Sequence, residues 1–252
     1  MAWTGKISGT DKPNKVIQTP WDLIYKISGI FDKIGNFERT EAFSVEVWFY
    51  QTSMKTGSLV SHGSDSPLLR GWICQSWTGR NLGISLCSDN NGNYLNVRTA
   101  SGIFSFNTWT HVVFTYNGTS LANGVKCYVN NSSKSLSVVG NTLTGTIVNS
   151  EKLWIGRSYP YGYFPGRIDE VVIYKRVLSA SEVSQRYNGG NGTETLFGDA
   201  YLHYHLNESS GDVVTDSSGN ARHAKTYGSP SWVSGKLNNC LQLNGSSQYI
   251  ST

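Results

Sequence analysis

The sequence is poor in charged residues and has no long apolar run. Charged residues make up 15% of its 252 positions, and the net charge of +4 comes from scattered lysines and arginines. A nucleic-acid-binding face needs basic residues in a cluster, so nucleic acid is not an expected partner. A membrane helix needs ~20 mostly apolar residues in a row, and no segment reaches that length. Membrane insertion is therefore not expected either.

The sequence also lacks paired cysteines and a secretion signal. Cys74, Cys87, Cys127 and Cys240 have no C-x-x-C spacing, which argues against a zinc site made of thiolates. Three of them, Cys87, Cys127 and Cys240, stand in alternating apolar segments and are predicted to be buried thiols. One disulfide in an oxidising compartment is the alternative. Residues 1–12 contain no apolar signal segment, so we expect a protein made in the cytoplasm or one whose leader was removed.

Turn-forming and aromatic residues are abundant instead. The chain holds 27 Gly, 8 Trp, 14 Tyr and 9 Phe, a composition typical of short strands joined by frequent turns. Period-two alternation predicts strands over residues 43–49, 82–86, 94–97, 109–116, 125–129, 153–156, 167–174, 200–206, 239–243 and 248–251. One short helix is predicted near 179–187, because Ser179-Ala-Ser-Glu182 has the pattern of a capping box. The fold class is therefore all-β, with antiparallel strands.

Several short motifs occur at a consistent spacing. In residues 37–190 they are Phe43-Ser-Val-Glu-Val-Trp48, Trp109-Thr-His-Val-Val-Phe-Thr-Tyr-Asn-Gly118 and Gly166-Arg-Ile-Asp-Glu-Val-Val-Ile-Tyr-Lys-Arg-Val-Leu-Ser179. In residues 199–252 they are Leu206-Asn-Glu208, Asp216-Ser-Ser-Gly-Asn220, Trp232-Val-Ser-Gly-Lys236 and Leu241-Gln-Leu-Asn-Gly-Ser-Ser-Gln-Tyr-Ile250. Together they resemble the laminin-G-like branch of the concanavalin A-like lectin/glucanase superfamily. The resemblance implies a two-sheet jelly-roll sandwich.

The order of these motifs is rotated relative to the family. The family's opening block lies last, at residues 199–252, behind a linker at 191–198, and the chain stops where the family sequence would run on into the Phe43 strand. Circular permutation, strand exchange with a neighbouring copy and a truncated tandem array each explain this order. A truncated array would leave apolar strands unpaired. We therefore expect residues 199–252 to complete the sandwich of residues 37–190, in the same or a neighbouring copy.

The first 36 residues match no family motif. Residues 1–36 are rich in apolar side chains, among them Trp3, Trp21, Ile24 and Phe31. They are predicted to form an extra strand packed on the chain's own domain or an arm that docks onto a partner.

The resemblance also implies a structural calcium ion. In relatives, the acid of the "IDEV" strand commonly shares calcium with oxygens near the family's opening segment, and calcium takes six to eight oxygen ligands. On that basis Asp169 is the first predicted ligand, with Asp216, Asn220 and Glu208 as its partners. The alternative is that residues 216–220 are only a turn held by bonds between side chains and backbone.

Catalysis is not expected. The glucanase relatives place carboxylates at alternate positions of one strand, and no E-x-D-x-x-E pattern occurs here. Asp169 and Glu170 are adjacent, so they are predicted to face opposite sides of a sheet. The five histidines show no spacing for a catalytic triad or a zinc site. His203 and His205 share a face with Tyr201 in regular alternation, and a half-exposed sheet surface explains them.

Aromatic residues in predicted loops and strand ends are candidates for glycan binding. Sugars stack on exposed aromatic rings, and the densest aromatic loop is Ser158-Tyr-Pro-Tyr-Gly-Tyr-Phe-Pro165. The predicted glycan-binding residues are Tyr159, Tyr161, Tyr163, Trp72 and Trp77. The alternative is that these rings cap the core or fill a subunit contact.

Two functions fit these features. The first is a non-catalytic, lectin-like decoration protein on a virus particle such as a phage, which self-associates or joins the larger particle and can also bind host glycans. The second is a secreted or cell-surface carbohydrate-binding module. Both place the chain on a virion or an extracellular surface. The fold alone does not decide between them, because function depends on the site.

Overall fold

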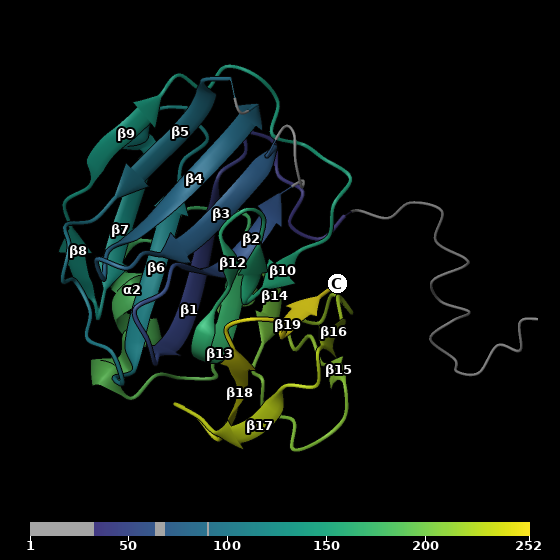
Figure 1. Cartoon of the computed structure of the whole chain (residues 1–252). Helices are drawn as coiled ribbons and strands as arrows, with labels where there is room; N and C mark the ends of the chain where they lie inside the picture. The colour runs from purple at the N-terminus through teal and green to yellow at the C-terminus, as the bar shows by residue number, and fades with distance from the viewer. Residues whose placement is uncertain (1–32, 64–68, 90) are drawn as a thin grey trace, which may run out of the picture. The chain divides into compact units, whose positions relative to one another are not determined.

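The computed structural model describes residues 33–63, 69–89 and 91–252. The predictions for residues 1–32 of the N-terminal arm lie outside the described residues. The described part folds as two large antiparallel sheets with one short α-helix among its elements (Figure 1). The all-β, two-sheet jelly-roll prediction is confirmed.

Eight strands form the first sheet. In spatial order it contains β17 (Ser231–Ser234), β18 (Asn239–Asn244), β13 (Pro165–Tyr174), β1 (Phe43–Gln51), β6 (Thr110–Tyr116), β7 (Val125–Val129) and β8 (Ser132–Lys134), with β14 (Ala200–Tyr204) paired to β13. The helix α2 (Ala180–Tyr187) and the short turn η2 (Asn188–Gly190) follow β13 along the chain.

Nine strands form the second sheet. In spatial order it contains β15 (Val213–Val214), β16 (Ala224–Tyr227), β19 (Tyr249–Ser251), β10 (Trp154–Ile155), β2 (Gly57–Gly63), β3 (Gly71–Ser76), β4 (Leu82–Asp89), β5 (Asn93–Arg98) and β9 (Ser137–Asn141). A two-stranded hairpin, β11 (Arg157–Ser158) and β12 (Gly162–Tyr163), contacts β2, and the turn η1 (Ala122–Gly124) precedes β7.

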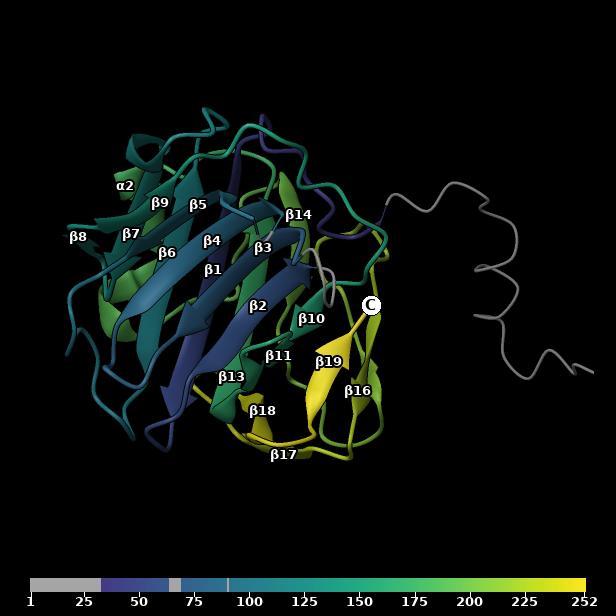
Figure 2. The ribbon, with the colours of Figure 1, turned by 45° about the horizontal axis from the view of Figure 1, so that its top comes forward.

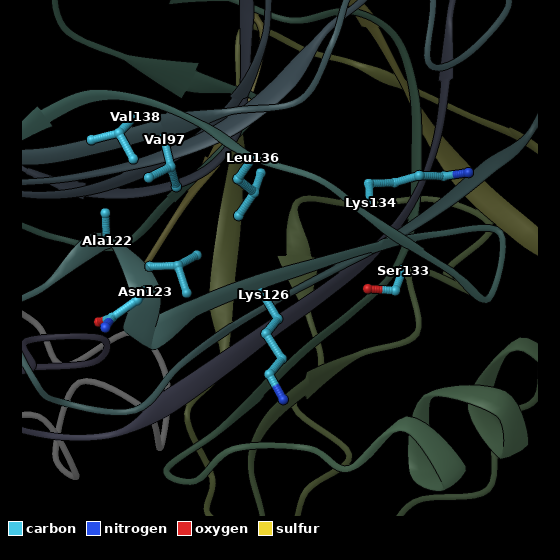
Figure 3. A pocket seen from close by; sticks show the side chains of 9 residues that line it. Val97, Ala122, Asn123, Lys126, Ser133, Lys134, Leu136 and Val138 are labelled. Atoms are coloured by element: carbon cyan, nitrogen blue, oxygen red, sulfur yellow. The ribbon is translucent and has the colours of Figure 1, made fainter.

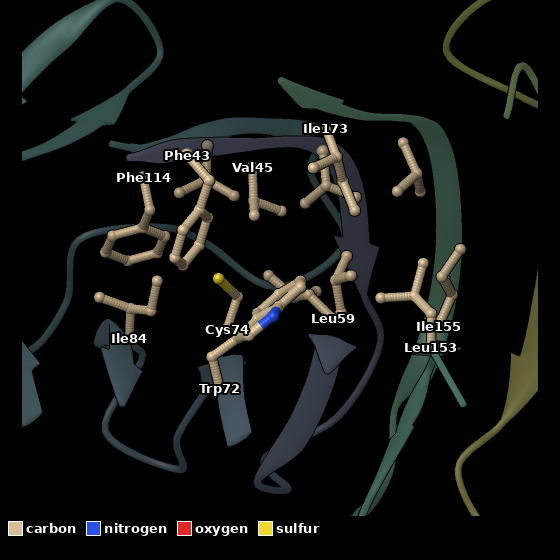
Figure 4. Close-up of a cluster of buried hydrophobic side chains, with 14 of the residues drawn as sticks. Phe43, Val45, Leu59, Trp72, Cys74, Ile84, Phe114, Leu153, Ile155 and Ile173 are labelled. Atoms are coloured by element: carbon tan, nitrogen blue, oxygen red, sulfur yellow. The ribbon is translucent and has the colours of Figure 1, made fainter. Parts of the chain in front are cut away.

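The main core lies between the two sheets. The alternation of β1 places Phe43, Val45 and Phe49 in it, as the sequence pattern predicts. From the opposite layer, Trp72 and Cys74 of β3 point toward Phe43 and Val45 (Figure 4).

The prediction that Trp72 binds a glycan is wrong. Its side chain is 1% exposed, and its indole N–H donates a hydrogen bond of 2.7 Å to the Gly35 carbonyl. Large aromatic side chains contribute most when they are buried with their polar atom satisfied, and Trp72 meets both conditions.

The predicted helix is confirmed, including its start. The Ser179 side chain accepts a hydrogen bond from the Glu182 backbone N–H, and Glu182 in turn bonds the Ser179 backbone N–H. The buried Val183 of α2 packs with Val172 and Tyr174 in a second apolar cluster on the outer face of the eight-stranded sheet. Helix α2 therefore covers part of that face.

The four cysteines are free thiols in the structure. Cys74, Cys127 and Cys240 are buried, which agrees with the prediction for Cys127 and Cys240. Cys87 is only half-buried.

Residues 199–252 pair with the rest of the same chain. One edge of β13 is shared by two of these strands: β18 pairs with residues 165–168 and β14 with residues 171–174. In the other sheet, β19 pairs with β10, and Figure 2 shows β19 and β16 at that edge. Strands from this segment thus enter both sheets.

A β-bulge lies where β14 and β18 meet along β13. In the pairing with β1, Glu46 opposes Val172 and Trp48 opposes Asp169, so β13 holds one extra residue there. Glu170 adopts the left-handed conformation, with φ +48°. A bulge of this kind breaks the alternation of side chains, so Asp169 and Glu170 both lie on the outer face. The prediction that they face opposite sides is wrong.

A second irregularity affects β14. Leu202 opposes Ile173 and Ala200 opposes Tyr174, which leaves Tyr201 as the extra residue. Tyr201 joins the main core, whereas His203 lies on the outer face opposite Val172. The prediction that Tyr201 shares a half-exposed face with the two histidines is therefore wrong.

The buried His62 predicts acid sensitivity. Burial lowers the pKa of His62 from 6.5 to about 4. Between these two pH values the unfolded chain binds a proton that the folded chain does not, so stability falls as pH drops from 6.5 toward 4. The full loss is about 3 kcal/mol. Urea unfolding across this pH range is expected to show a smaller pH slope for His62→Gln than for the wild type, and equal slopes would contradict the assignment.

Candidate functional site

Aromatic side chains gather around one arginine on the outer face of the nine-stranded sheet. Ile155 and Ile250 point into the core, so their neighbours Trp154 and Tyr249 face outward from the paired strands β10 and β19. Tyr227 of β16 opposes Tyr249 in the next strand pairing.

The arginine comes from the hairpin that follows β10. Arg157 opposes Tyr163 in the β11–β12 pairing, and the Ser61 hydroxyl donates a hydrogen bond of 2.7 Å to the Arg157 carbonyl. The backbone of Arg157 is thus tied to β2. We refer to Trp154, Arg157, Tyr163, Tyr227 and Tyr249 as the Arg157 aromatic cluster.

The arginine is held between aromatic faces. The Arg157 guanidinium carbon lies 4.5 Å from the Trp154 ring centre and 4.9 Å from that of Tyr249. The Tyr163 ring centre is 6.0 Å away. Tyr227 stacks on Tyr249 with ring centres 4.9 Å apart and an interplanar angle of 10°. Cation–π contacts at such distances orient a guanidinium without using its N–H donors.

The cluster is partly open to solvent. Tyr227 is 39% exposed, and Arg157, Tyr163 and Tyr249 are half-buried. Among the residues that the structure describes, no acceptor takes a hydrogen bond from the Arg157 guanidinium. Trp154 is buried, at 5% exposed, so the rings open to a ligand are those of the three tyrosines. The cluster therefore offers tyrosine rings for stacking and a charged donor group for a polar ligand.

The structure unites one of the predicted glycan residues with residues that the sequence did not indicate. Tyr163 is in the cluster, and Tyr159 and Tyr161 lie in the adjoining hairpin turn, where Tyr159 is 42% exposed. Trp77 lies apart from them, with the Arg98 guanidinium carbon 4.2 Å from its ring centre.

The residues missed by sequence reasoning are Trp154, Arg157, Tyr227 and Tyr249. Alternation alone places Trp154 and Tyr249 on the face opposite Ile155 and Ile250, and this signal could have identified both.

Two shallow hollows lie elsewhere on the described surface. One, of about 280 Å³, opens between the sheets and is lined by Val97, Val125, Leu136 and Val138 among others, with the Lys126 and Lys134 side chains extending away from the valines (Figure 3). Another, of about 320 Å³, lies around Tyr201. The first hollow has no aromatic residue in its lining. In the second, the Arg222 guanidinium carbon lies 3.9 Å from the Tyr201 ring centre, but Arg222 already donates a hydrogen bond to the Tyr201 carbonyl.

The predicted calcium ligand Asp169 is already surrounded by N–H donors. One carboxylate oxygen accepts hydrogen bonds from the backbone N–H groups of Lys236 at 2.8 Å and Leu237 at 3.0 Å. The other accepts from the Glu170 N–H at 2.9 Å. Calcium needs oxygen atoms that face one another, whereas these oxygens face the positive ends of amide dipoles.

The other predicted calcium ligands are engaged in the same way. Asp216 accepts backbone hydrogen bonds from His203 and Arg222, both at 2.9 Å. Asn220 donates through its amide, and Glu208 accepts from the Thr215 N–H at 2.8 Å through Oε1. The Glu208 Oε2 is buried without a hydrogen-bond partner, but calcium takes six to eight oxygen ligands. These contacts fit the turn alternative for residues 216–220. The four predicted residues therefore do not form a site that fits calcium. The calcium ion stays a prediction of the family resemblance.

A buried ionic cluster lies under helix α2, on the outer face of the eight-stranded sheet. The Arg186 Nε donates to both carboxylate oxygens of Glu46, at 3.1 and 3.0 Å, and the His111 Nε2 lies 3.0 Å from Glu46. Burial raises the pKa of Glu46, but the Arg186 guanidinium and the His111 ring lower it more, so this pKa lies below its usual range. Glu170 lies beside the same arginine, 3.7 Å from its Nη2. These carboxylates are enclosed.

None of the helices in the described residues is long and apolar enough to cross a membrane.

Comparison with solved structures finds distant relatives. A candidate carbohydrate-binding protein from Bacteroides ovatus ATCC 8483 is 17% identical, with a TM-score of 0.48, over 84% of this chain and 54% of that protein. This chain therefore spans about half the length of that relative.

Two further structures are similar at the same level. The CBM40 of the Ruminococcus gnavus IT-sialidase, bound to α2,3-sialyllactose, is 16% identical with a TM-score of 0.45, over 57% of this chain and 80% of that one. The heptameric SAP-like pentraxin of Limulus polyphemus is 14% identical with a TM-score of 0.45, over 62% and 73% of the two chains. No curated protein sequence matches this chain.

The family is established by the sequence profile. Residues 30–184 match the profile described as the concanavalin A-like lectin/glucanases superfamily, and this segment exceeds half of the chain. The match contains the β1, β6 and β13 motifs that suggested the resemblance. The chain belongs to the concanavalin A-like lectin/glucanases superfamily.

Proposed function

We propose that this chain is a non-catalytic carbohydrate-binding module that binds glycans at the Arg157 aromatic cluster. The observation that carries the proposal is the position of Arg157, which is held between Trp154 and Tyr249 while its N–H donors have no acceptor among the described residues. A pyranose ring has an apolar face of C–H groups that stacks on aromatic rings, and its hydroxyl groups accept hydrogen bonds. Binding sites commonly combine apolar walls with a few fixed polar groups in this way.

The charge of Arg157 favours acidic sugars. A guanidinium binds a carboxylate through two parallel hydrogen bonds, which neutral hydroxyl groups cannot match in strength. The cluster contains no carboxylate that would repel such a ligand. Neutral glycans would use the same rings but gain less from the arginine.

The absence of a carboxylate in the cluster also supports binding rather than hydrolysis. Glycoside hydrolysis commonly uses two carboxyl groups that flank the bond to be cut. The buried acids Glu46, Asp169 and Glu170 lie on the outer face of the other sheet and are held by hydrogen bonds.

The role on a virus particle remains a second prediction. It depended on the N-terminal arm, most of which lies outside the described residues, and on strand exchange. The strands of residues 199–252 pair within their own chain here, so no observation favours the particle over a secreted or cell-surface module.

Glycan-array binding tests the proposal through two substitutions. Arg157→Ala removes the charged donor and Tyr249→Ala removes one of the rings that hold it. Hydrogen bonds to charged groups contribute about 1.5–3 kcal/mol, so each variant is expected to bind about 10- to 100-fold more weakly. Binding of acidic glycans should decrease more than that of neutral glycans in Arg157→Ala.

Arg98→Ala is the matched control, because Arg98 lies over Trp77 on the same sheet in a similar cation–π contact. It is expected to bind as the wild type does. Loss of binding in Arg98→Ala alone would move the site to Trp77, and a folded wild-type chain that binds no glycan would overturn the proposed function.

A further inference from the structure

We propose that Glu170, His203 and His205 form a binding site for a divalent transition-metal ion, with Zn²⁺ as the expected ion. The site lies on the outer face of the eight-stranded sheet, whereas the Arg157 aromatic cluster lies on the nine-stranded sheet. The inference is therefore independent of the proposed function.

Strand geometry brings the two histidines together. Tyr204 and Leu206 both lie in the core, so His203 of β14 and His205, one residue beyond its end, both face outward. Their ring centres are only 3.8 Å apart. Residues at i and i+2 of a strand share one face, so this H-x-H pair presents two imidazoles in one direction.

The bulge in β13 supplies the carboxylate. Because Glu170 is the extra residue with φ +48°, its side chain lies on the same outer face as the histidines instead of entering the core. The His203 Nε2 lies 2.7 Å from one carboxylate oxygen, and the His205 Nδ1 lies 2.8 Å from the other. A regular strand would not place Glu170 there.

The distances suit a metal after a small adjustment. One ligand atom from each of the three residues lies within 4.8 Å of the others. Zinc bonds of ~2.0–2.1 Å in tetrahedral geometry place neighbouring ligand atoms about 3.3 Å apart. The ligand set is also chemically suitable, since two histidines and one glutamate leave a fourth position for water. Calcium prefers an all-oxygen set and does not fit.

The electrostatic surroundings allow a cation to bind. Arg186 lies 3.7 Å from Glu170 and opposes a positive ion, but Glu46 engages its Nε with both carboxylate oxygens. The charges of Glu46 and Arg186 therefore offset each other, which leaves the charge of Glu170 for the metal. The His205 side chain is 22% exposed, so an ion can reach the site from that side.

Zinc titration of the full chain tests the proposal. After metal removal with a chelator, reloading with Zn²⁺ and buffer exchange, the wild type is expected to retain about one Zn²⁺ per chain and to melt at a higher temperature with zinc than without it. Calcium should leave the melting temperature unchanged. His203→Gln and His205→Gln each remove one ligand and are expected to weaken zinc binding at least about tenfold.

Two control variants test whether residues outside this site contribute to the measured zinc binding. Cys87→Ser removes the half-buried thiol, and His223→Gln removes a histidine outside the cluster; both should bind zinc as the wild type does. The visible spectrum of the Co²⁺-loaded wild type adds a readout that does not require a variant to fold. It should show nitrogen and oxygen ligation without a thiolate charge-transfer band.

Three results would overturn the inference. These are a wild type that holds no zinc after reloading, folded His203→Gln and His205→Gln variants with unchanged affinity, or a cobalt spectrum dominated by thiolate. Glycan binding at the Arg157 aromatic cluster can succeed or fail without affecting any of them.

Discussion

A chain that ends at residue 198 is expected to be unfolded. Residues 199–252 supply β14 and β18 to one edge of β13 and β19 to the edge of β10. Their side chains Leu202, Leu241, Leu243 and Ile250 are at most 1% exposed and belong to the main core. Truncating a single buried leucine or isoleucine to alanine costs about 2–5 kcal/mol. Loss of all four would cost about 8–20 kcal/mol, as much as or more than the 5–15 kcal/mol that stabilise a typical domain.

Circular dichroism and urea unfolding of the truncated chain measure this effect. The matched control is a permuted chain in which residues 199–252 precede residue 37, because it has the same core residues in the family's strand order. It should retain the β-sheet spectrum and unfold cooperatively. A truncated chain that is monomeric and cooperatively folded would contradict the expectation.

The mass of the full chain in solution distinguishes pairing within one copy from exchange between copies. The strand pairings of the structure predict a core completed by one chain. A stable dimer that persists on dilution, and that is lost when the linker at residues 191–198 is lengthened, would instead indicate exchange of residues 199–252 between copies.

Local patterns in the sequence were enough to predict part of the fold. Strands β1, β6 and β13 alternate apolar and polar residues clearly, and the capping box of Ser179 and Glu182 marks the start of α2. Strands β2 and β3 were not predicted. Both are buried along their whole length, and hairpin β11–β12 contacts β2. Their apolar residues are adjacent, as in Leu59-Val60 and Trp72-Ile73-Cys74, instead of alternating with polar ones. Without alternation, no period-two signal remains.

The candidate sites depend on tertiary pairing that no local pattern records. Tyr163 was predicted from its aromatic loop, whereas Tyr227 and Tyr249 reach it only because the last strands of the chain pair beside β10. The position of Glu170 depends on one extra residue in β13. A shift of one residue moves a side chain to the other face, and nothing in the sequence around Asp169 and Glu170 shows where that shift occurs.

Replacement of Arg186 by alanine is expected to cost about 3–5 kcal/mol of stability, the usual effect of leaving one partner of a buried ion pair without the other. Arg186 is 1% exposed, and its contact with Glu46 joins α2 to β1. Its Nη1 also donates a hydrogen bond of 2.6 Å to the Thr195 carbonyl in the linker. The matched control is Arg176→Ala. Arg176 pairs with Glu182 and Asp199 but is 33% exposed, so its loss should cost about 0–1 kcal/mol.

The deficit of Arg186→Ala is expected to shrink as the pH falls. In the wild type the pKa of Glu46 is lower in the folded chain than in the unfolded chain. The ionised carboxylate therefore stabilises the fold at pH values above its unfolded pKa, and this stabilisation is lost as the pH falls through its folded pKa. Without Arg186, burial dominates and raises the pKa of Glu46, so the variant loses stability as pH rises.

Urea unfolding at pH 7 and pH 4 measures the difference in stability between the wild type and Arg186→Ala. The double variant Glu46→Leu/Arg186→Met, which removes both charges, should be more stable at pH 7 than Arg186→Ala. A loss of equal size at both pH values would mean that Arg186 stabilises the chain through packing and the Thr195 contact rather than through the charge of Glu46.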